Sequence, residues 1–419
     1  MAEKRNMIIA QSGGPSSAIN ASITGAIARG MASSQIDHVL GAVNGMQGFL
    51  DRKIINISDQ MKDSDDFRHL IHTPAHALRS SRYKIKSGDE ETYKKIVDIL
   101  KEFNIKYFFY NGGNDSMDTV YQLSEYLKKT GEDIVALGIP KTIDNDLELT
   151  DHTPGFGSAA RYVATSIAEL YLDTCVYPQP ACTIVEIMGR NAGWLTAASA
   201  LARETGLPAP HLIYLPELPF DQEAFIRTVQ ETLEQDDHIL IAVSEGLHTA
   251  DGKYLSDTGA TEDMFGHKTL GGAASYLEKI VKENVKMPNL KTRAIQFSTL
   301  QRAAAHCASF TDLDESYQCG YRAVELAVNK KSGLMVTIAR ISDVPYVVRY
   351  DEGDLSQIAN KEKKVPLEWI TKDGTDVSEE MLVYLRPLVT RPTSGIQEFG
   401  LPKYFTFDIN KIVTPRDVK

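Results

Sequence analysis

Short apolar, β-branched runs alternate with amphipathic segments of helical length along most of this chain. The runs are brief and bounded by glycine or polar residues, which favours strands in a fully buried sheet. The predicted strands are Met7–Ala10, Val39–Val43, Tyr107–Tyr110, Ile134–Ile139, Cys182–Met188, His211–Leu215, Ile239–Val243, Arg293–Phe297 and Leu334–Ala339. The predicted helices are Ala18–Met31, Glu91–Phe103, Met117–Lys129, Ala159–Leu172, Gln222–Glu234, Gly272–Glu283 and Tyr317–Asn329. This alternation predicts an α/β protein with mainly parallel sheets flanked by helices.

The composition of the chain indicates which kinds of binding partner are unfavourable. The 419 residues carry 45 Lys and Arg against 56 Asp and Glu, a formal charge of −11, which argues against a nucleic-acid binder or an anionic-membrane binder. We find no apolar stretch long enough for a membrane helix and no signal-peptide core. The four cysteines match neither a zinc site nor a disulfide framework, so we predict a cytoplasmic location.

Four loops that follow predicted strands carry most of the chemistry. In open α/β sheets, ligands collect where strands end and helices begin, because loop amides and helix N-termini point there. The loops are Gln11–Ser17, Asn111–Ser116, Pro140–Asp146 and Met188–Trp194.

Two of these loops are rich in glycine at the start of a helix. Gly13 and Gly14 permit a close backbone approach to a phosphate, but no Gly-Lys-Ser/Thr closes the motif, and plain turn geometry is an alternative interpretation. In the second loop Asp115 could simply cap the following helix. The third loop favours chemistry, because Lys141, Thr142, Asp144 and Asp146 supply the cation, hydroxyl and carboxylates that phosphoryl transfer needs.

A second group of residues suits an anionic sugar. Met188-Gly189-Arg190 combines close backbone approach with a forked donor, and Glu245 can accept hydrogen bonds from a polyol. Arg293 and Arg302 form a plausible second anionic clamp. Taken alone, each arginine is more typical of a surface or ion-pair residue than of a ligand contact.

From about residue 7 to about residue 340, these loops in this order resemble the phosphofructokinase family. The string Thr142-Ile143-Asp144-Asn145-Asp146, followed by Met188-Gly189-Arg190, is the specific part of the match. The resemblance implies Mg²⁺-dependent phosphoryl transfer to the C1 hydroxyl of fructose 6-phosphate, in a cleft between two lobes of a glycolytic enzyme. It also implies a homodimer or homotetramer.

The resemblance divides the chain into three parts. We expect a phosphoryl-donor lobe at 1–150 and about 303–350, a sugar-phosphate lobe at 151–302, and a C-terminal extension at 351–419. The extension is set apart because the alternation of strands and helices weakens after about residue 350.

Residue roles also follow from the resemblance. Asp144 would be the general base, Arg82 would bridge donor and acceptor phosphates, and Asn114 and Asp146 would hold the metal. The implied pyrophosphate-binding residues are Gly13, Gly14, Arg82, Asp115, Ser116 and Lys141. The implied sugar-phosphate residues are Thr142, Asp144, Met188, Gly189, Arg190, Glu245, Arg293, Thr299 and Arg302.

The donor is indicated by two positions. Members that use ATP carry glycine where this chain has Asp115 and where it has Lys141, whereas pyrophosphate-dependent members carry Asp and Lys there. A carboxylate at 115 would repel a nucleotide α-phosphate by on the order of 4 kcal/mol, for unit charges about 4 Å apart at an effective dielectric near 20. The resemblance is therefore to the pyrophosphate-dependent class.

Three positions depart from the family pattern and keep alternatives open. Asn114 replaces a metal-linked Asp, Ala181 replaces an Arg that reaches a neighbouring subunit, and Thr299 replaces a His or Tyr. One alternative has the same chemistry on another acceptor, such as sedoheptulose 7-phosphate, and another is an ATP-dependent phosphofructokinase. A third is a catalytically silent sugar-phosphate sensor or regulatory subunit.

Overall fold

The structure is a computed structural model that describes residues 4–81, 83, 85, 88–258, 261–262, 268–269, 272–393 and 395–419. Its contacts divide the chain into two compact units. Unit 1 contains Met1–Ser158, Arg302–Glu362 and Thr390–Lys419, and unit 2 contains Ala159–Gln301 and Lys363–Val389. The segment after residue 350, predicted as a separate extension, is thus shared between the two units.

Unit 1 is built on a seven-stranded sheet with the order β13-β12-β5-β4-β1-β2-β3. The pairs from β12 through β2 are parallel, and β13 and β3 join the two edges antiparallel. The strands are β1 (Arg5–Gln11), β2 (Ile36–Ala42), β3 (Ile54–Asn56), β4 (Ile105–Gly112), β5 (Val135–Pro140), β12 (Leu334–Asp343) and β13 (Tyr346–Asp354).

The central strands are apolar on both faces because both faces are covered. In β1, Ile8 and Ala10 pack into one core cluster, whereas Met7 and Ile9 pack into another. The period of two in a strand sends alternate side chains to opposite faces, so a strand buried on both sides reads as a continuous apolar run.

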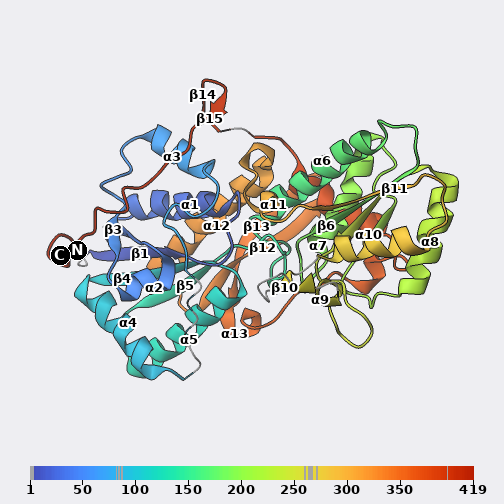
Figure 1. Cartoon of the computed structure of the whole chain (residues 1–419). Helices are drawn as coiled ribbons and strands as arrows, with labels where there is room; N and C mark the ends of the chain where they lie inside the picture. The colour runs from blue at the N-terminus through green and yellow to red at the C-terminus, as the bar shows by residue number, and fades with distance from the viewer. Residues whose placement is uncertain are drawn as a thin grey trace. The chain divides into compact units, whose positions relative to one another are not determined.

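Helices cover the two faces in separate groups. Figure 1 shows α1 (Ile19–Met31) and α12 (Phe310–Val328) on one side of this sheet, and α4 (Glu90–Glu102) and α5 (Asn114–Thr130) on the other. The remaining helical elements of unit 1 are α2 (Gly45–Leu50), α3 (Ser64–Ile71), η2 (Ala305–Cys307) and α13 (Leu355–Ile358), with a small hairpin of β14 (Gln397–Glu398) and β15 (Leu401–Pro402).

Unit 2 contains a parallel four-stranded sheet with the order β11-β6-β8-β7. Its strands are β6 (Ala181–Ile187), β7 (Leu212–Tyr214), β8 (His238–Ser244) and β11 (Lys291–Gln296), with the short pair β9 (Thr261–Glu262) and β10 (Lys268–Thr269) apart from them. Its helices are α7 (Trp194–Ala198), η1 (Ser199–Thr205), α8 (Gln222–Gln235), α9 (Leu255–Thr258), α10 (Ala273–Asn284), η3 (Leu367–Trp369), α14 (Glu379–Leu385) and η4 (Arg386–Val389). Two further helices, α6 (Phe156–Thr174) and α11 (Leu300–Ala303), span the boundaries between the units.

The strand order of unit 1 places its loops for ligand binding. β1 lies between β2 on one side and β4 on the other, and the helices that follow β1 and β4 lie on opposite faces. The two connections therefore diverge at the carboxyl ends of β1 and β4, which is the topological switch point where open α/β sheets bind ligands.

The predicted α/β class is confirmed, and every predicted strand and helix overlaps an observed one. In the two large sheets, the edge strands β3 and β13 were not predicted, nor were the short pairs β9–β10 and β14–β15. β13 lies at the antiparallel edge and alternates half-buried with exposed positions, so Tyr346–Asp354 lacks the apolar run of the central strands. Helix α12 begins at Phe310 rather than Tyr317, because the Ser309 side chain accepts a hydrogen bond from the Asp312 N–H and caps it.

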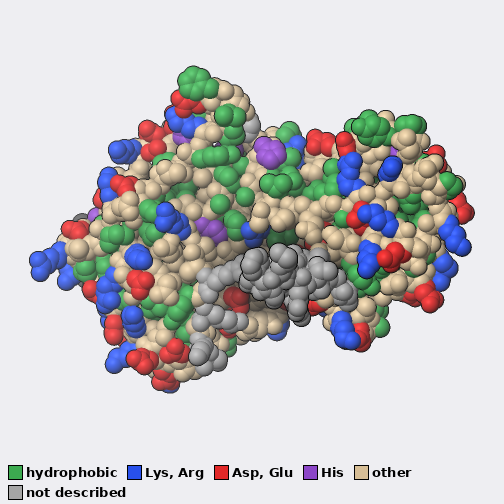
Figure 2. All heavy atoms as spheres, viewed as in Figure 1, with side chains coloured by type: hydrophobic (Ala, Val, Ile, Leu, Met, Phe, Trp, Pro, Cys, Tyr) green, Lys and Arg blue, Asp and Glu red, His purple; other side chains and the backbone are tan. Residues whose placement is uncertain are grey.

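The structure also shows how the charged side chains and the cysteines are arranged. On the face shown in Figure 2, Lys and Arg side chains are interspersed with Asp and Glu. Within the described part of the chain, none of the four cysteines forms a disulfide. Of the helices in the described part of the chain, none combines the length and hydrophobicity required to cross a membrane.

Candidate active site

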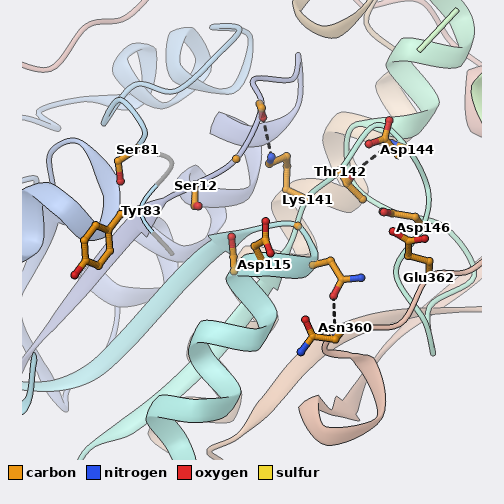
Figure 3. Close-up of a pocket in the computed structure, with 15 residues that line it drawn as sticks. Ser12, Ser81, Tyr83, Asp115, Lys141, Thr142, Asp144, Asp146, Asn360 and Glu362 are labelled. Atoms are coloured by element: carbon orange, nitrogen blue, oxygen red, sulfur yellow. Dashed lines mark hydrogen bonds between the residues drawn. The ribbon is translucent and has the colours of Figure 1, made fainter. Parts of the chain in front are cut away.

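Three strand-end loops of unit 1 meet around one cavity of about 720 Å³ (Figure 3). They follow β1, β4 and β5, whose last residues are in register as neighbours: Gln11 pairs with Asn111, and Gly112 pairs with Pro140. The cavity is lined by Ser12, Gly13, Gly14, Ser81, Tyr83, Gly113, Asn114, Asp115, Ser116, Lys141, Thr142, Asp144, Asp146, Asn360 and Glu362.

Lys141 is directed onto the first glycine loop. Its ammonium donates to the Gly14 carbonyl over 2.7 Å, and its side chain is almost completely buried. Burial lowers the pKa of Lys141 to about 8, although Asp144 and Asp146 act in the opposite direction. A buried cation with carboxylates nearby and an anion-sized space in front of it suits a phosphate.

Gly13 is required by this arrangement for two reasons. Its φ is +79°, in the left-handed region that glycine adopts without strain. A Cβ at this position would also lie 3.1 Å from Nζ of Lys141. The glycine therefore leaves room for the lysine and exposes loop backbone to the cavity.

The loop after β4 places three predicted residues at the cavity. Asp115 is exposed in the first turn of α5, and Ser116 is buried behind it. Asn114, predicted as a metal ligand, accepts the Asn360 N–H at 2.8 Å and donates to the Lys361 carbonyl. Both polar atoms of its amide are therefore hydrogen-bonded to a segment that is distant in the sequence.

The loop after β5 supplies two carboxylates to the same cavity. Asp144 and Asp146 both line it, and Figure 3 shows Asp146 on the same side as Glu362. The Thr142 hydroxyl accepts the backbone N–H of Asp144 over 3.1 Å, which holds the turn that carries the first carboxylate.

Arg302 lies at this first group of loops in unit 1. The position of a Cβ on Gly14 would be 3.4 Å from Nη1 of Arg302. Its Nε is buried with no hydrogen-bond partner among the described residues. Predicted as a sugar-phosphate ligand, it is thus a second cation, after Lys141, beside the first glycine loop.

His76 was not predicted as a site residue. It lies near the Ser12 carbonyl, with Nε2 3.4 Å from that oxygen. Burial, followed by the charges of Lys141 and Arg302, lowers the pKa of His76 to about 4, so it is neutral at pH 7. The sequence around His76 carries no signal that it would fold back onto the first loop.

A second group of predicted residues comes together in unit 2. β6 and β8 are paired so that Ile187 lies opposite Ser244, which brings Met188–Arg190 next to Glu245. The Gly189 N–H donates to Oε1 of Glu245 over 3.4 Å, and the Met188 N–H donates to Oε1 of Gln301 over 3.2 Å. Gln301 is a buried support that sequence reasoning missed.

Two predicted residues lie elsewhere, and one is not described. Arg293 pairs in register with Thr183, well before the end of β6, and forms an ion pair with Asp173 beside a separate cavity of about 410 Å³. Within the chain the structure therefore does not bring Arg293 to the loops of Met188 and Glu245. Thr299 is exposed on the loop after β11. Arg82 lies outside the described residues.

Comparison with known proteins gives a consistent result. Residues 6–327 match the family model described as Phosphofructokinase. A pyrophosphate–fructose 6-phosphate 1-phosphotransferase of Halomonas elongata is 40% identical over 96% of this chain and 95% of its own. One from Xanthomonas campestris pv. campestris is 39% identical over 95% of both chains.

A solved structure agrees over the whole chain. The pyrophosphate-dependent phosphofructokinase of Marinobacter aquaeolei is 36% identical, with a TM-score of 0.86 over 98% of this chain and 97% of its own. Both the sequence match and the structural match therefore extend over both units.

Proposed function

Because this chain belongs to the phosphofructokinase family, we propose that it transfers a phosphoryl group from Mg-pyrophosphate to the C1 hydroxyl of fructose 6-phosphate. The products are fructose 1,6-bisphosphate and phosphate. The observation that carries this proposal is the cavity of unit 1, in which Lys141, Asp115 and Asp144 line one space with two glycine loops. Pyrophosphate and the sugar phosphoester are energetically similar, so the reaction runs readily in both directions.

The donor assignment rests on the charges that face the cavity. The buried Lys141 ammonium stabilises charge on the transferring group or on the leaving phosphate, an effect worth roughly 2.7–4 kcal/mol of barrier in comparable sites. The Asp115 carboxylate lines the same cavity and would repel a further phosphate of a nucleotide. This combination favours the short pyrophosphate donor.

Asp144 is the proposed general base. It accepts the proton of the C1 hydroxyl while the new O–P bond forms and the bond to the leaving phosphate breaks, with Gly13, Gly14 and Ser116 close to the phosphates. Arg82 keeps its predicted role between the two phosphates.

Magnesium enters this proposal with pyrophosphate. Among the described residues, no group of three or more His, Cys, Asp or Glu is placed to hold a metal by itself. The oxygen ligands at the cavity nevertheless fit Mg²⁺, which is commonly held by one or two carboxylates together with substrate phosphates. Asp146 would supply a carboxylate, and the prediction that Asn114 is a ligand stays untested. The ion would neutralise charge on the transferring phosphoryl group.

The sugar phosphate is assigned to Met188, Gly189, Arg190 and Glu245 of unit 2, with Arg302, Thr142 and Thr299. Arg293 lies away from its own chain's strand-end loops, which suits a contribution to the site of another copy. We therefore retain a homodimer or homotetramer in the proposal, and a cytoplasmic location in keeping with the free thiols.

The donor assignment is tested by offering pyrophosphate and ATP separately in a coupled assay with fructose 6-phosphate and Mg²⁺. The wild type should turn over with pyrophosphate and not with ATP. The double variant Asp115→Gly, Lys141→Gly should lose most pyrophosphate activity and admit some ATP, because it removes both the repelling carboxylate and the ammonium. Glu125→Ala, an exposed change on α5, is the matched control. A wild type that prefers ATP would overturn the assignment.

A further inference from the structure

The side chain of Asn114 holds a segment far away in the sequence. Its Oδ1 accepts the Asn360 N–H at 2.8 Å, and its Nδ2 donates to the Lys361 carbonyl. One helical turn further along α5, Asp118 accepts from Nδ2 of Asn360 over 3.0 Å. Three hydrogen bonds thus attach residues 360–361 to the first turns of α5.

The backbone of Asn360 is shaped for this attachment. α13 ends at Ile358, and Asn360 has φ +60°, a left-handed conformation that asparagine tolerates better than most residues. The chain therefore turns directly after the helix and presents its N–H and side chain to α5.

The attached segment forms part of the wall of the donor cavity. Asn360 and Glu362 both line it, and Figure 3 shows them together with Asp115 and Asp146 around the same space. Asn114 contacts the wall segment directly, whereas Glu362 follows the two attached residues in the chain. The attachment therefore holds the backbone that immediately precedes Glu362.

We propose that Asn114 is a positioning residue that clamps Asn360–Glu362 as a wall of the pyrophosphate pocket and thereby selects a short donor. This inference rests on the proposed function. The wall adds a carboxylate at 362 to that of Asp115, and these charges oppose a donor with additional phosphates beyond the second.

The chemistry of the amide explains why a neutral residue occupies position 114. The amide of asparagine offers an acceptor atom for the Asn360 N–H and a separate donor atom for the Lys361 carbonyl. Aspartate would keep the acceptor but would set a carboxylate oxygen against that carbonyl. Asparagine in place of the family's aspartate at position 114 therefore adds a hydrogen bond that holds the wall segment.

The first experiment measures how firmly residues 360–361 are held, without an activity assay. Native full-length protein is digested with trypsin, and cleavage between Lys361 and Glu362 is followed by mass spectrometry. Asn114→Ala and Asn114→Asp should be cleaved about tenfold faster than the wild type, because each loses the hydrogen bond to the Lys361 carbonyl and cleavage tracks the open population. Tenfold corresponds to about 1.4 kcal/mol. Glu125→Ala should behave as the wild type.

The second experiment measures how strongly the enzyme prefers pyrophosphate over a longer donor. The ratio of kcat/KM for pyrophosphate to kcat/KM for tripolyphosphate should fall about tenfold in Asn114→Ala, mainly through a lower KM for tripolyphosphate, and stay unchanged in Glu125→Ala. Unchanged cleavage in both Asn114 variants, or an unchanged donor ratio in Asn114→Ala, overturns the inference. A wild type inactive with pyrophosphate refutes the proposed function instead, and the cleavage arm still tests the clamp.

Discussion

At the scale of single residues, the donor pocket depends on polar groups placed in a buried setting. Lys141 is buried at the end of β5, and it reaches the first loop through its hydrogen bond to the Gly14 carbonyl. The neighbouring His76 is kept neutral by burial and by the cations beside it. Among the described residues, Lys141 and Arg302 are therefore the cations that lie beside the first glycine loop.

Lys141 should give the enzyme an alkaline limit near pH 8. Its pKa in the free protein is lowered to about 8, so the ammonium is lost as pH rises through that value, whereas a lysine with the ordinary pKa of 10.5 would stay charged. We expect kcat/KM for pyrophosphate to fall tenfold per pH unit above that point, measured from pH 6.5 to 9.5.

Lys141→Arg is the control for this profile. Its guanidinium stays charged over the whole range, so the variant, although less active, should lack the decline that belongs to the lysine. Pyrophosphate ionises identically in both assays. An equal decline in both proteins would assign the limit to another group.

At the scale of elements, unit 1 depends on a close crossing of two helices. A Cβ on Gly25 of α1 would lie 1.9 Å from the Tyr317 carbonyl oxygen, and one on Gly320 of α12 would lie 1.7 Å from that of Ser22. Both clashes are with backbone atoms, so no change of side-chain rotamer can relieve them. Helix α1, which follows the first glycine loop, therefore packs closely against α12 at these two glycines.

Gly320→Ala should destabilise the protein strongly. Alanine is the better helix former by about 1 kcal/mol, but the added methyl group forces two packed helices apart, so we expect a net loss of about 3 kcal/mol. Urea unfolding measures it. Gly30→Ala on α1 is the matched variant, because its Cβ would meet the flexible Met7 thioether instead of backbone. Equal losses in the two variants would contradict the crossing argument.

At the scale of the whole molecule, remote parts of the chain complete one core. Unit 1 is assembled from three separate stretches, and the last of them ends in the core cluster that holds Ile8 and Phe108. Val418 is buried there, and its carbonyl accepts from Nδ2 of Asn6 over 2.7 Å. The stretch also pairs Val413 with Ile54, since the Val413 N–H donates to its carbonyl.

Removing Val418 and Lys419 should therefore destabilise unit 1 more than removing Lys419 alone. The longer deletion removes the buried Val418 side chain from the core and the carbonyl that accepts a hydrogen bond from Asn6. Together these losses should lower the free energy of unfolding by about 2–4 kcal/mol. The shorter deletion removes only an exposed residue. Chemical denaturation compares the two, and equal stability would show that this contact contributes nothing.

The strands and their loop chemistry could be read from the sequence because both are local. Apolar runs mark β1, β4 and β5, and parallel strands end at a common edge, where Gly13, Asp115 and Lys141 follow them. The amphipathic segments likewise marked the helices that cover the sheet.

Long-range placement could not be read in the same way. Asn360 and Glu362 reach the donor cavity only because β12, β13 and α13 return the chain to α5, and nothing in their own neighbourhood marks them. Arg293 was predicted to form an anionic clamp with Arg302, but strand register places it beside Asp173. Local periodicity and residue chemistry are properties of neighbours along the chain, whereas contacts between remote segments depend on how the sheet and its covering helices pack.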